Sequence, residues 1–146
     1  MAPSLESQWL PGVPGSTAGE TMSFDWSMWL SLAEAEVRRT MESLPLALRD
    51  NVRHVPVIFE RRPGRDLQED GIEPDTLGLF TGEPFSETGT TTAPLPARII
   101  LFLENIREAA EGDEARYREE VRATLLHELG HYLGLDEIDL EERGLD

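Results

Sequence analysis

The sequence predicts an α+β domain in which two long helices pack against a small β-sheet. Two segments, 26–44 and 113–133, repeat apolar residues every three or four positions, which is typical of helices with one buried face. Three short stretches between them are rich in β-branched and aromatic residues, as strands are. The chain has 146 residues and is 39% hydrophobic, which is enough for one modest core.

The first long helix is expected from Trp26 to Leu44. Its apolar residues share one helical face: Trp26, Leu30, Ala33, Val37, Met41 and Leu44. Asp25 is a candidate N-cap, and Pro45 disfavours a helical conformation in the residue before it. "LALRDN" (46–51) then predicts a short turn.

The N-terminal segment, residues 1–22, is rich in Pro, Gly, Ser and Thr. This composition buries little apolar surface, so we predict a disordered tail. The folded domain is accordingly expected at residues 23–146.

Three strands are expected in the middle of the chain. "HVPVIFE" (54–60) is the first, and Pro56 within it favours an edge position or a bulge because proline lacks a ladder donor. "TLGLF" (76–80) is a weaker candidate, and "ARIILFLE" (97–104) is the strongest. The connecting segments are polar or rich in Gly and Pro and are predicted loops.

The last long helix follows a short predicted helix, "NIREAAE" (105–111). Asp113 is placed to cap it, and Gly134 falls where a left-handed residue often ends a helix. The residues at core spacing are Tyr117, Val121, Leu125, Leu129 and Tyr132 or Leu133.

This helix carries the stretch "LLHELGHYLGLDEIDL" (125–140), in which His127 and His131 are four residues apart. Residues at this spacing share a helix face about 6 Å apart along the axis, so both imidazoles can reach one cation. The chain has no cysteine, so a zinc site must use nitrogen and oxygen ligands, and imidazole and carboxylate suit zinc. The motif therefore predicts a site for one zinc ion; the competing interpretation is an exposed helical face with incidental histidines.

Glu128 is next to the first histidine and flanks the ligand face rather than sharing it. A carboxylate in this position can take the proton of a zinc-activated water, which is the chemistry of the H-E-x-x-H motif. Glu128 is therefore the predicted catalytic base.

A third protein ligand is expected downstream of Gly134, where a sharp turn can return an acid to the metal. Only fifteen residues follow His131, too few for a separate ligand-bearing helix. Glu137, six residues after His131, is the favoured ligand, and Asp136 and Asp139 remain alternatives.

The charge of the chain limits its partners. Thirteen basic and twenty-nine acidic residues give a net charge of −16, which repels phosphate backbones, so we expect no nucleic-acid binding. Cations, basic peptides and basic protein surfaces are favoured instead. No apolar run is long enough to cross a bilayer and no secretory signal is visible, so we expect no membrane partner and a cytoplasmic location.

The segment "VRATLLHELGHYLGLDEIDLEERGL" (121–145) resembles the C-terminal signature of the minimal zincins, small bacterial zincin-like metallopeptidases. "LAEAEVRRTMESLPLALRDNVRHVPVIFE" (32–60), "LGLFTGEPFSE" (77–87) and "PLPARIILFLENI" (94–106) resemble other parts of the same family. The resemblance implies a minimal zincin-like fold with a small mixed sheet. It also implies zinc ligation by His127, His131 and Glu137 with Glu128 as base, although many members carry aspartate where Glu137 stands.

Two functions follow from these residues. The first is a zinc-dependent metallopeptidase acting on a peptide or protein substrate, and the acidic charge of the chain favours a basic one. The alternative is a metal-binding interaction module with little or no proteolysis. The resemblance further implies that strand 97–104 presents an open edge to substrate. The structural alternative is an ordinary internal strand.

Three side chains have a structural and a functional interpretation. Thr124 either supports a ligand or bonds its own helix, and Tyr132 is expected to be a core or rim aromatic rather than an oxyanion donor. His54 has no partner motif, so we expect a surface or satisfied core histidine.

Overall fold

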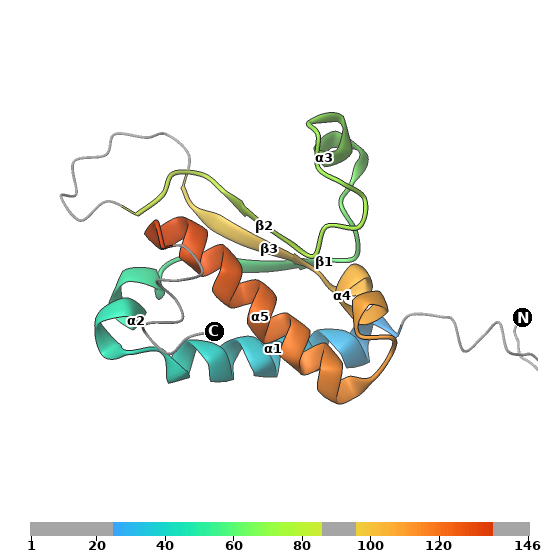
Figure 1. Ribbon diagram of the computed structural model, residues 1–146, viewed down its shortest axis with the longest axis horizontal. Coiled ribbons are helices and arrows are strands. Elements are labelled where there is room, and N and C mark those ends of the chain that lie inside the picture. The colour runs from blue at the N-terminus through green and yellow to red at the C-terminus, as the bar shows by residue number, and fades with distance from the viewer. Residues whose placement is uncertain (1–24, 86–95, 136–146) are drawn as a thin grey trace, which may run out of the picture.

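A computed structural model describes residues 25–85 and 96–135 (Figure 1). The predicted tail, 1–22, lies outside these residues. The described residues form the following elements: α1 (Trp26–Ser43), α2 (Leu46–Val52), β1 (Val57–Glu60), α3 (Arg65–Glu69), β2 (Gly78–Thr81), β3 (Arg98–Phe102), α4 (Leu103–Ala109) and α5 (Glu114–Leu133). None of the helices in these residues is long and apolar enough to cross a membrane.

The three strands form a mixed sheet in the order β1-β3-β2, with β1 parallel and β2 antiparallel to β3. The prediction of a small mixed sheet is confirmed. The expectation that strand 97–104 offers an open edge is wrong, because β3 is the central strand and both its sides are paired. Within residues 25–85 and 96–135, the open edges belong to β1 and β2, which agrees with the edge position favoured by Pro56.

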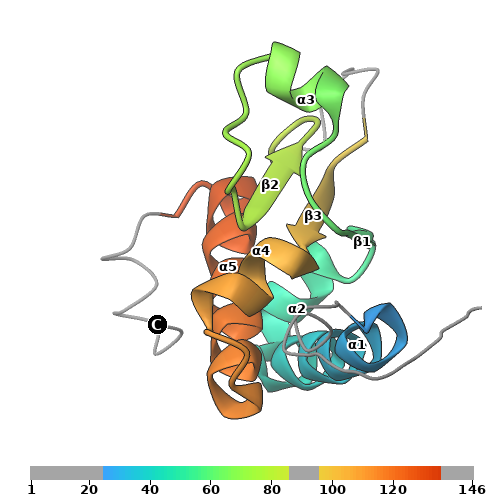
Figure 2. The ribbon, with the colours of Figure 1, turned by 90° about the vertical axis from the view of Figure 1, so that its right-hand side faces the viewer.

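The two long helices α1 and α5 pack against each other, and α5 also contacts β2 and β3 (Figures 1 and 2). Tyr117 joins the two helices: its hydroxyl donates to the carbonyl of Trp29 at 2.8 Å, and its ring meets the Trp29 ring edge-on. Ile99 and Leu101 of β3 belong to the same core. The predicted α+β arrangement is confirmed, with the difference that of the two long helices α5 packs on the sheet, whereas α1 packs on α5 and α4.

Helix α1 is rotated relative to the predicted apolar stripe. Asp25 caps it as expected, accepting from the backbone of Met28 at 3.3 Å. Its buried residues, however, are Trp29, Ala33, Glu36 and Thr40, whereas Trp26, Leu30, Val37 and Met41 are only partly buried. The edge-on contact of Trp29 with Tyr117 lies on this buried face, and Arg39 compensates the Glu36 carboxylate at 2.6 Å.

Several boundaries also differ from the prediction. Residues 46–52 form a helix rather than a turn, β1 begins at Val57 rather than at His54, and the loop expected over 61–75 contains α3. The strand expected over 97–104 ends at Phe102 because α4 begins at the next residue. The spacing of apolar residues alone does not show where a strand ends and the next helix begins when both segments are apolar.

Asn105, a buried residue of α4, holds the segment that leads into β2. Its side-chain amide donates to the carbonyl oxygens of Pro74 and Thr76, each at 2.8 Å. Arg62 in turn donates to the Asn105 side-chain oxygen and to the carboxylates of Glu104 and Glu108, each at 2.6 Å. These bonds fix the start of β2 relative to α4, and thus relative to α5, on which α4 packs.

Candidate metal centre

Helix α5 separates a core face from a polar face. Asp113 caps it, accepting from the Arg116 backbone at 2.9 Å. The predicted core residues are all buried: Tyr117, Val121, Leu125, Leu129 and Tyr132. His127 and His131 are exposed, so the helix period places them away from the core as predicted.

The two imidazoles converge. Their Nε2 atoms are 3.1 Å apart, and the rings are nearly perpendicular at 82°. Two nitrogens bound tetrahedrally to zinc at about 2.05 Å would be about 3.3 Å apart. The pair is therefore already spaced to share one ion.

Glu128 points from α5 toward the sheet. It is 8% exposed, and its carboxylate accepts a hydrogen bond from the backbone N–H of Phe80 in β2. Burial raises the pKa of this carboxyl group, and the two histidines and the Phe80 N–H oppose the rise. The glutamate therefore lies between the histidine pair and an edge strand.

These residues fit a zinc ion. One donor atom from each of His127, Glu128 and His131 lies within 4.8 Å of the other two. Two imidazole nitrogens are ligands that zinc accepts, a carboxylate beside them can take a proton, and the chain has no thiolate to compete. The predicted third ligand, Glu137, and its alternatives Asp136 and Asp139 lie outside the described residues.

Gly134 ends α5 as predicted, in the left-handed region at φ 74°. The Leu135 N–H donates to the Gly130 carbonyl at 2.8 Å and the Gly134 N–H to that of His131 at 3.2 Å. This pair of bonds is the Schellman motif. The chain thus leaves the helix within three residues of the second histidine, as the motif requires.

A family model described as "Zincin-like metallopeptidase" matches residues 52–145, which include β1 through α5 and the whole H-E-x-x-H motif. The chain belongs to this family. No curated protein matches it. Membership of the zincin-like metallopeptidases indicates a hydrolase that holds a metal, and the convergence of His127 and His131 agrees with it.

The contact between α5 and β2 in this zincin depends on Gly78, a residue that the sequence analysis did not single out. A Cβ atom on Gly78 would lie 2.5 Å from Cγ2 of Thr124 and 3.3 Å from Cγ of Glu128. Only glycine therefore lets β2 approach the helix at this point. A glycine inside a strand pattern is the sequence signal for such an approach.

The structure gives contacts for each of the three residues that have two interpretations. The Thr124 methyl group packs toward Gly78. Tyr132 is a buried core aromatic, as expected, in edge contact with the rings of Phe80 and Phe85. His54 is exposed, as expected for a surface histidine, and its Nε2 lies 3.3 Å from the Tyr132 hydroxyl.

Proposed function

We propose that the chain is a zinc-dependent peptidase that hydrolyses peptide bonds with Glu128 as general base. The observation that carries this proposal is the pair of Nε2 atoms 3.1 Å apart beside a buried carboxylate, on the helix of a zincin-like metallopeptidase. We further propose a peptide or protein as the substrate.

The metal would be held by His127 and His131, with Glu137 as the third ligand. Zinc bound there supplies a coordinated water whose pKa falls toward about 7, and it polarises a substrate carbonyl. The short helix exit at Gly134 supports a third ligand close in sequence to the second histidine.

Glu128 would transfer the proton. Its carboxylate takes a proton from the attacking water and then donates it to the leaving amine. The raised pKa of the buried carboxyl group supports this cycle, because a base whose pKa is closer to neutrality also returns its proton more readily. The bond from the Phe80 N–H orients the carboxylate.

The outer edge of β2 is the surface that would align the substrate. Leu77 accepts from Phe102 at 2.9 Å, so Leu77 faces β3. Since inward and outward groups alternate along an antiparallel pair, the backbone groups of Gly78 and Phe80 point away from β3. The Phe80 N–H is bonded to Glu128, so an extended peptide can pair with the Gly78 backbone and the Phe80 carbonyl and would then pass Glu128.

The decisive experiment compares the wild type with Glu128→Ala, using measured zinc content and a peptide-library digest. We expect the variant to keep zinc and lose turnover. Glu119→Ala is the matched control, because Glu119 is an exposed glutamate of the same helix and should leave both unchanged. Undiminished turnover in Glu128→Ala would refute the mechanism. Stoichiometric zinc without turnover in the wild type would favour a metal-binding interaction module instead.

The third ligand is tested separately by zinc affinity. Glu137→Ala should weaken zinc binding much more than Asp136→Ala or Asp139→Ala. The reverse ranking would identify the aspartate with the larger effect as the third ligand. It would leave the proposed role of Glu128 unchanged.

A further inference from the structure

A hollow of about 300 Å³ lies next to the histidine pair, between α5 and the start of β2. Its lining residues are Leu77, Gly78, Ala123, Thr124, His127 and Glu128. Two of these residues, Gly78 and Ala123, contribute no bulky side chain, and the Thr124 methyl group and Leu77 give the hollow apolar walls. The hollow therefore suits the aliphatic stem of a long side chain.

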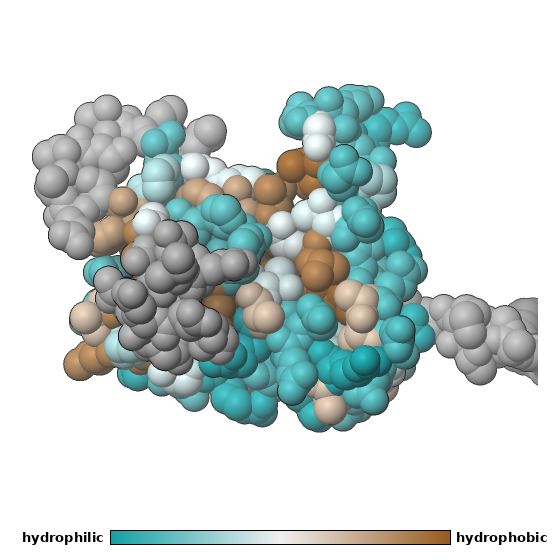
Figure 3. All heavy atoms as spheres, viewed as in Figure 1, coloured by the Kyte–Doolittle hydropathy of each residue, from teal (hydrophilic) through white to brown (hydrophobic). Residues whose placement is uncertain are grey.

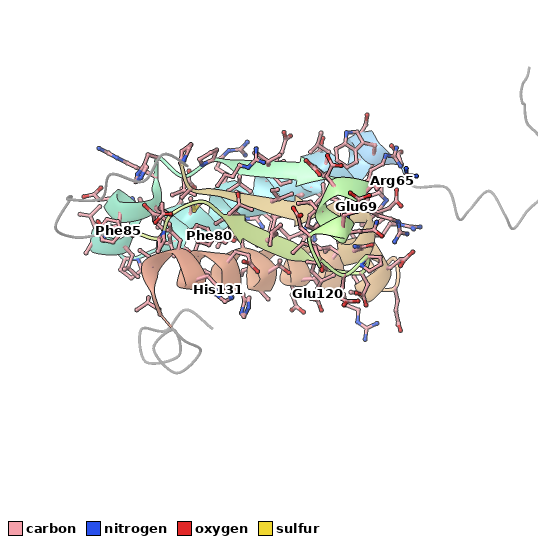
Figure 4. All side chains as sticks on the ribbon, turned by 90° about the horizontal axis from the view of Figure 1, so that it is seen from above. Arg65, Glu69, Phe80, Phe85, Glu120 and His131 are labelled. Carbon is pink, nitrogen blue, oxygen red and sulfur yellow. The ribbon has the colours of Figure 1, made fainter. Side chains whose placement is uncertain are left out.

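One acidic residue, Glu120, lies on α5 beyond the hollow, on the helix face that carries Ala123 and Thr124. Glu120 precedes Ala123 and Thr124 by three and four residues and His127 by seven, so all four share one helix face. Glu120 lies on the same helix as His131 in the view from above (Figure 4). It is about 6 Å along the axis from Thr124 and about 10 Å from His127, at 1.5 Å per residue.

The Glu120 carboxylate has no ion-pair partner within residues 25–85 and 96–135. Arg116 is one turn earlier on the same face, but its guanidinium is 2.8 Å from Glu111. Glu120 is also partly buried, so its charge is less screened than that of a fully exposed glutamate. Glu120 does not itself line the hollow, but a cation that extends beyond Thr124 along α5 would meet a carboxylate that no cation of the described residues neutralises.

We propose that Glu120 is a specificity-determining residue that selects a lysine or arginine side chain of the substrate. The stem of that side chain lies along Leu77, Ala123 and the Thr124 methyl group, and its cationic head meets the Glu120 carboxylate. Lysine and arginine have this combination of an apolar stem and a charged head. The inference rests on the proposed peptidase function, and it narrows the substrate to peptides with a basic residue near the scissile bond.

The surface around the site agrees with a cationic ligand. The net charge of −16 attracts basic peptides before any specific contact forms. The face that carries α5 is mostly hydrophilic, with some hydrophobic residues showing in its middle (Figure 3). Overall charge, however, favours every basic peptide alike, whereas Glu120 favours a cation at one position relative to the cut.

The test uses full-length protein and peptides that differ at one position, which carries lysine, methionine or glutamate. A scan of that position along the peptide first finds where lysine helps most. We expect kcat/KM for the lysine peptide to exceed that for the methionine peptide about tenfold, since a charge-assisted hydrogen bond contributes that much. Glu120→Gln should bring the two peptides near parity, and Glu120→Lys should favour the glutamate peptide. Glu119→Gln is the matched control and should keep the preference for lysine.

A second measurement does not need turnover. Fluorescence anisotropy measures the Kd of labelled peptides for the Glu128→Ala protein. The same measurement is made on two double variants, in which Glu128→Ala is combined with Glu120→Gln or with Glu119→Gln. Tighter binding of the lysine peptide, lost with Glu120→Gln alone, supports the inference even if the wild type hydrolyses nothing and the proposed function fails. The inference is overturned if Glu120→Gln leaves the order of the three peptides unchanged, whether they are ranked by kcat/KM or by Kd. That result would leave the peptidase proposal standing.

Discussion

Replacement of Gly78 by alanine tests whether the close approach of β2 to α5 is as tight as the structure has it. The added Cβ would lie 2.5 Å from Cγ2 of Thr124 and 3.4 Å from Cδ2 of Leu101. Non-bonded carbons prefer about 3.5–4.0 Å, so the first contact is short by at least about 1 Å. Either the strand moves away from the helix or the Thr124 side chain rotates.

The size of the effect follows from two opposing terms. Overpacking of a filled interior costs about 1–3 kcal/mol. Loss of glycine flexibility in the unfolded chain stabilises by about 0.4–1 kcal/mol. We therefore expect Gly78→Ala to lower the free energy of unfolding by about 1–2 kcal/mol, measured by urea denaturation. Peptide turnover should fall as well, because the new methyl group also lies 3.3 Å from Cγ of Glu128.

The pair Gly78→Ala and Thr124→Ser makes the prediction specific. Serine removes the methyl group that the new Cβ would meet, so the double variant should be at least as stable as Gly78→Ala alone. Thr124→Ser in the wild-type background should cost stability, because it deletes a buried methyl group. Gly64→Ala is the control: nothing lies within 4 Å of a Cβ there, so a change within about 0.5 kcal/mol is expected. Wild-type stability in Gly78→Ala, or additive losses in the double variant, would refute the reasoning.

Three further predictions concern stability. Burial raises the pKa of Glu104, but hydrogen bonds from Arg62 and Arg61 outweigh it and leave the pKa lowered. The ionised form is thus stabilised, so Glu104→Gln should lower the free energy of unfolding by about 1 kcal/mol at neutral pH. The difference from wild type should vanish in acid below the folded-state pKa, and a loss of stability independent of pH would contradict this. Tyr117→Phe removes the hydrogen bond to the Trp29 carbonyl and should lower the free energy of unfolding by about 1 kcal/mol, seen as a lower urea midpoint. An unchanged midpoint would show that this bond does not stabilise the fold. A chelator should lower Tm, and Tm should rise with the logarithm of free zinc; a Tm insensitive to both would argue against a native-state metal site.

Local periodicity predicted the parts of the site that lie on one helix. The spacing of His127 and His131 places both on one face of any α-helix, and Gly134 ends that helix by its own backbone freedom. The core positions of α5 followed from the same period. These features depend on residues a few positions apart, so no knowledge of the rest of the chain was needed.

The tertiary structure decided what faces that helix. A strand's sequence does not state its neighbours, so the central position of β3 and the open edge of β2 came only from the pairing of residues far apart in the chain. The same non-local contacts bury Glu128, bring the Phe80 N–H to its carboxylate and make Gly78 necessary. The sequence by itself determined that two histidines and a glutamate lie together on α5. Only the packing of β2 against α5 decided that the glutamate is buried beside an edge strand, because that contact joins segments about fifty residues apart.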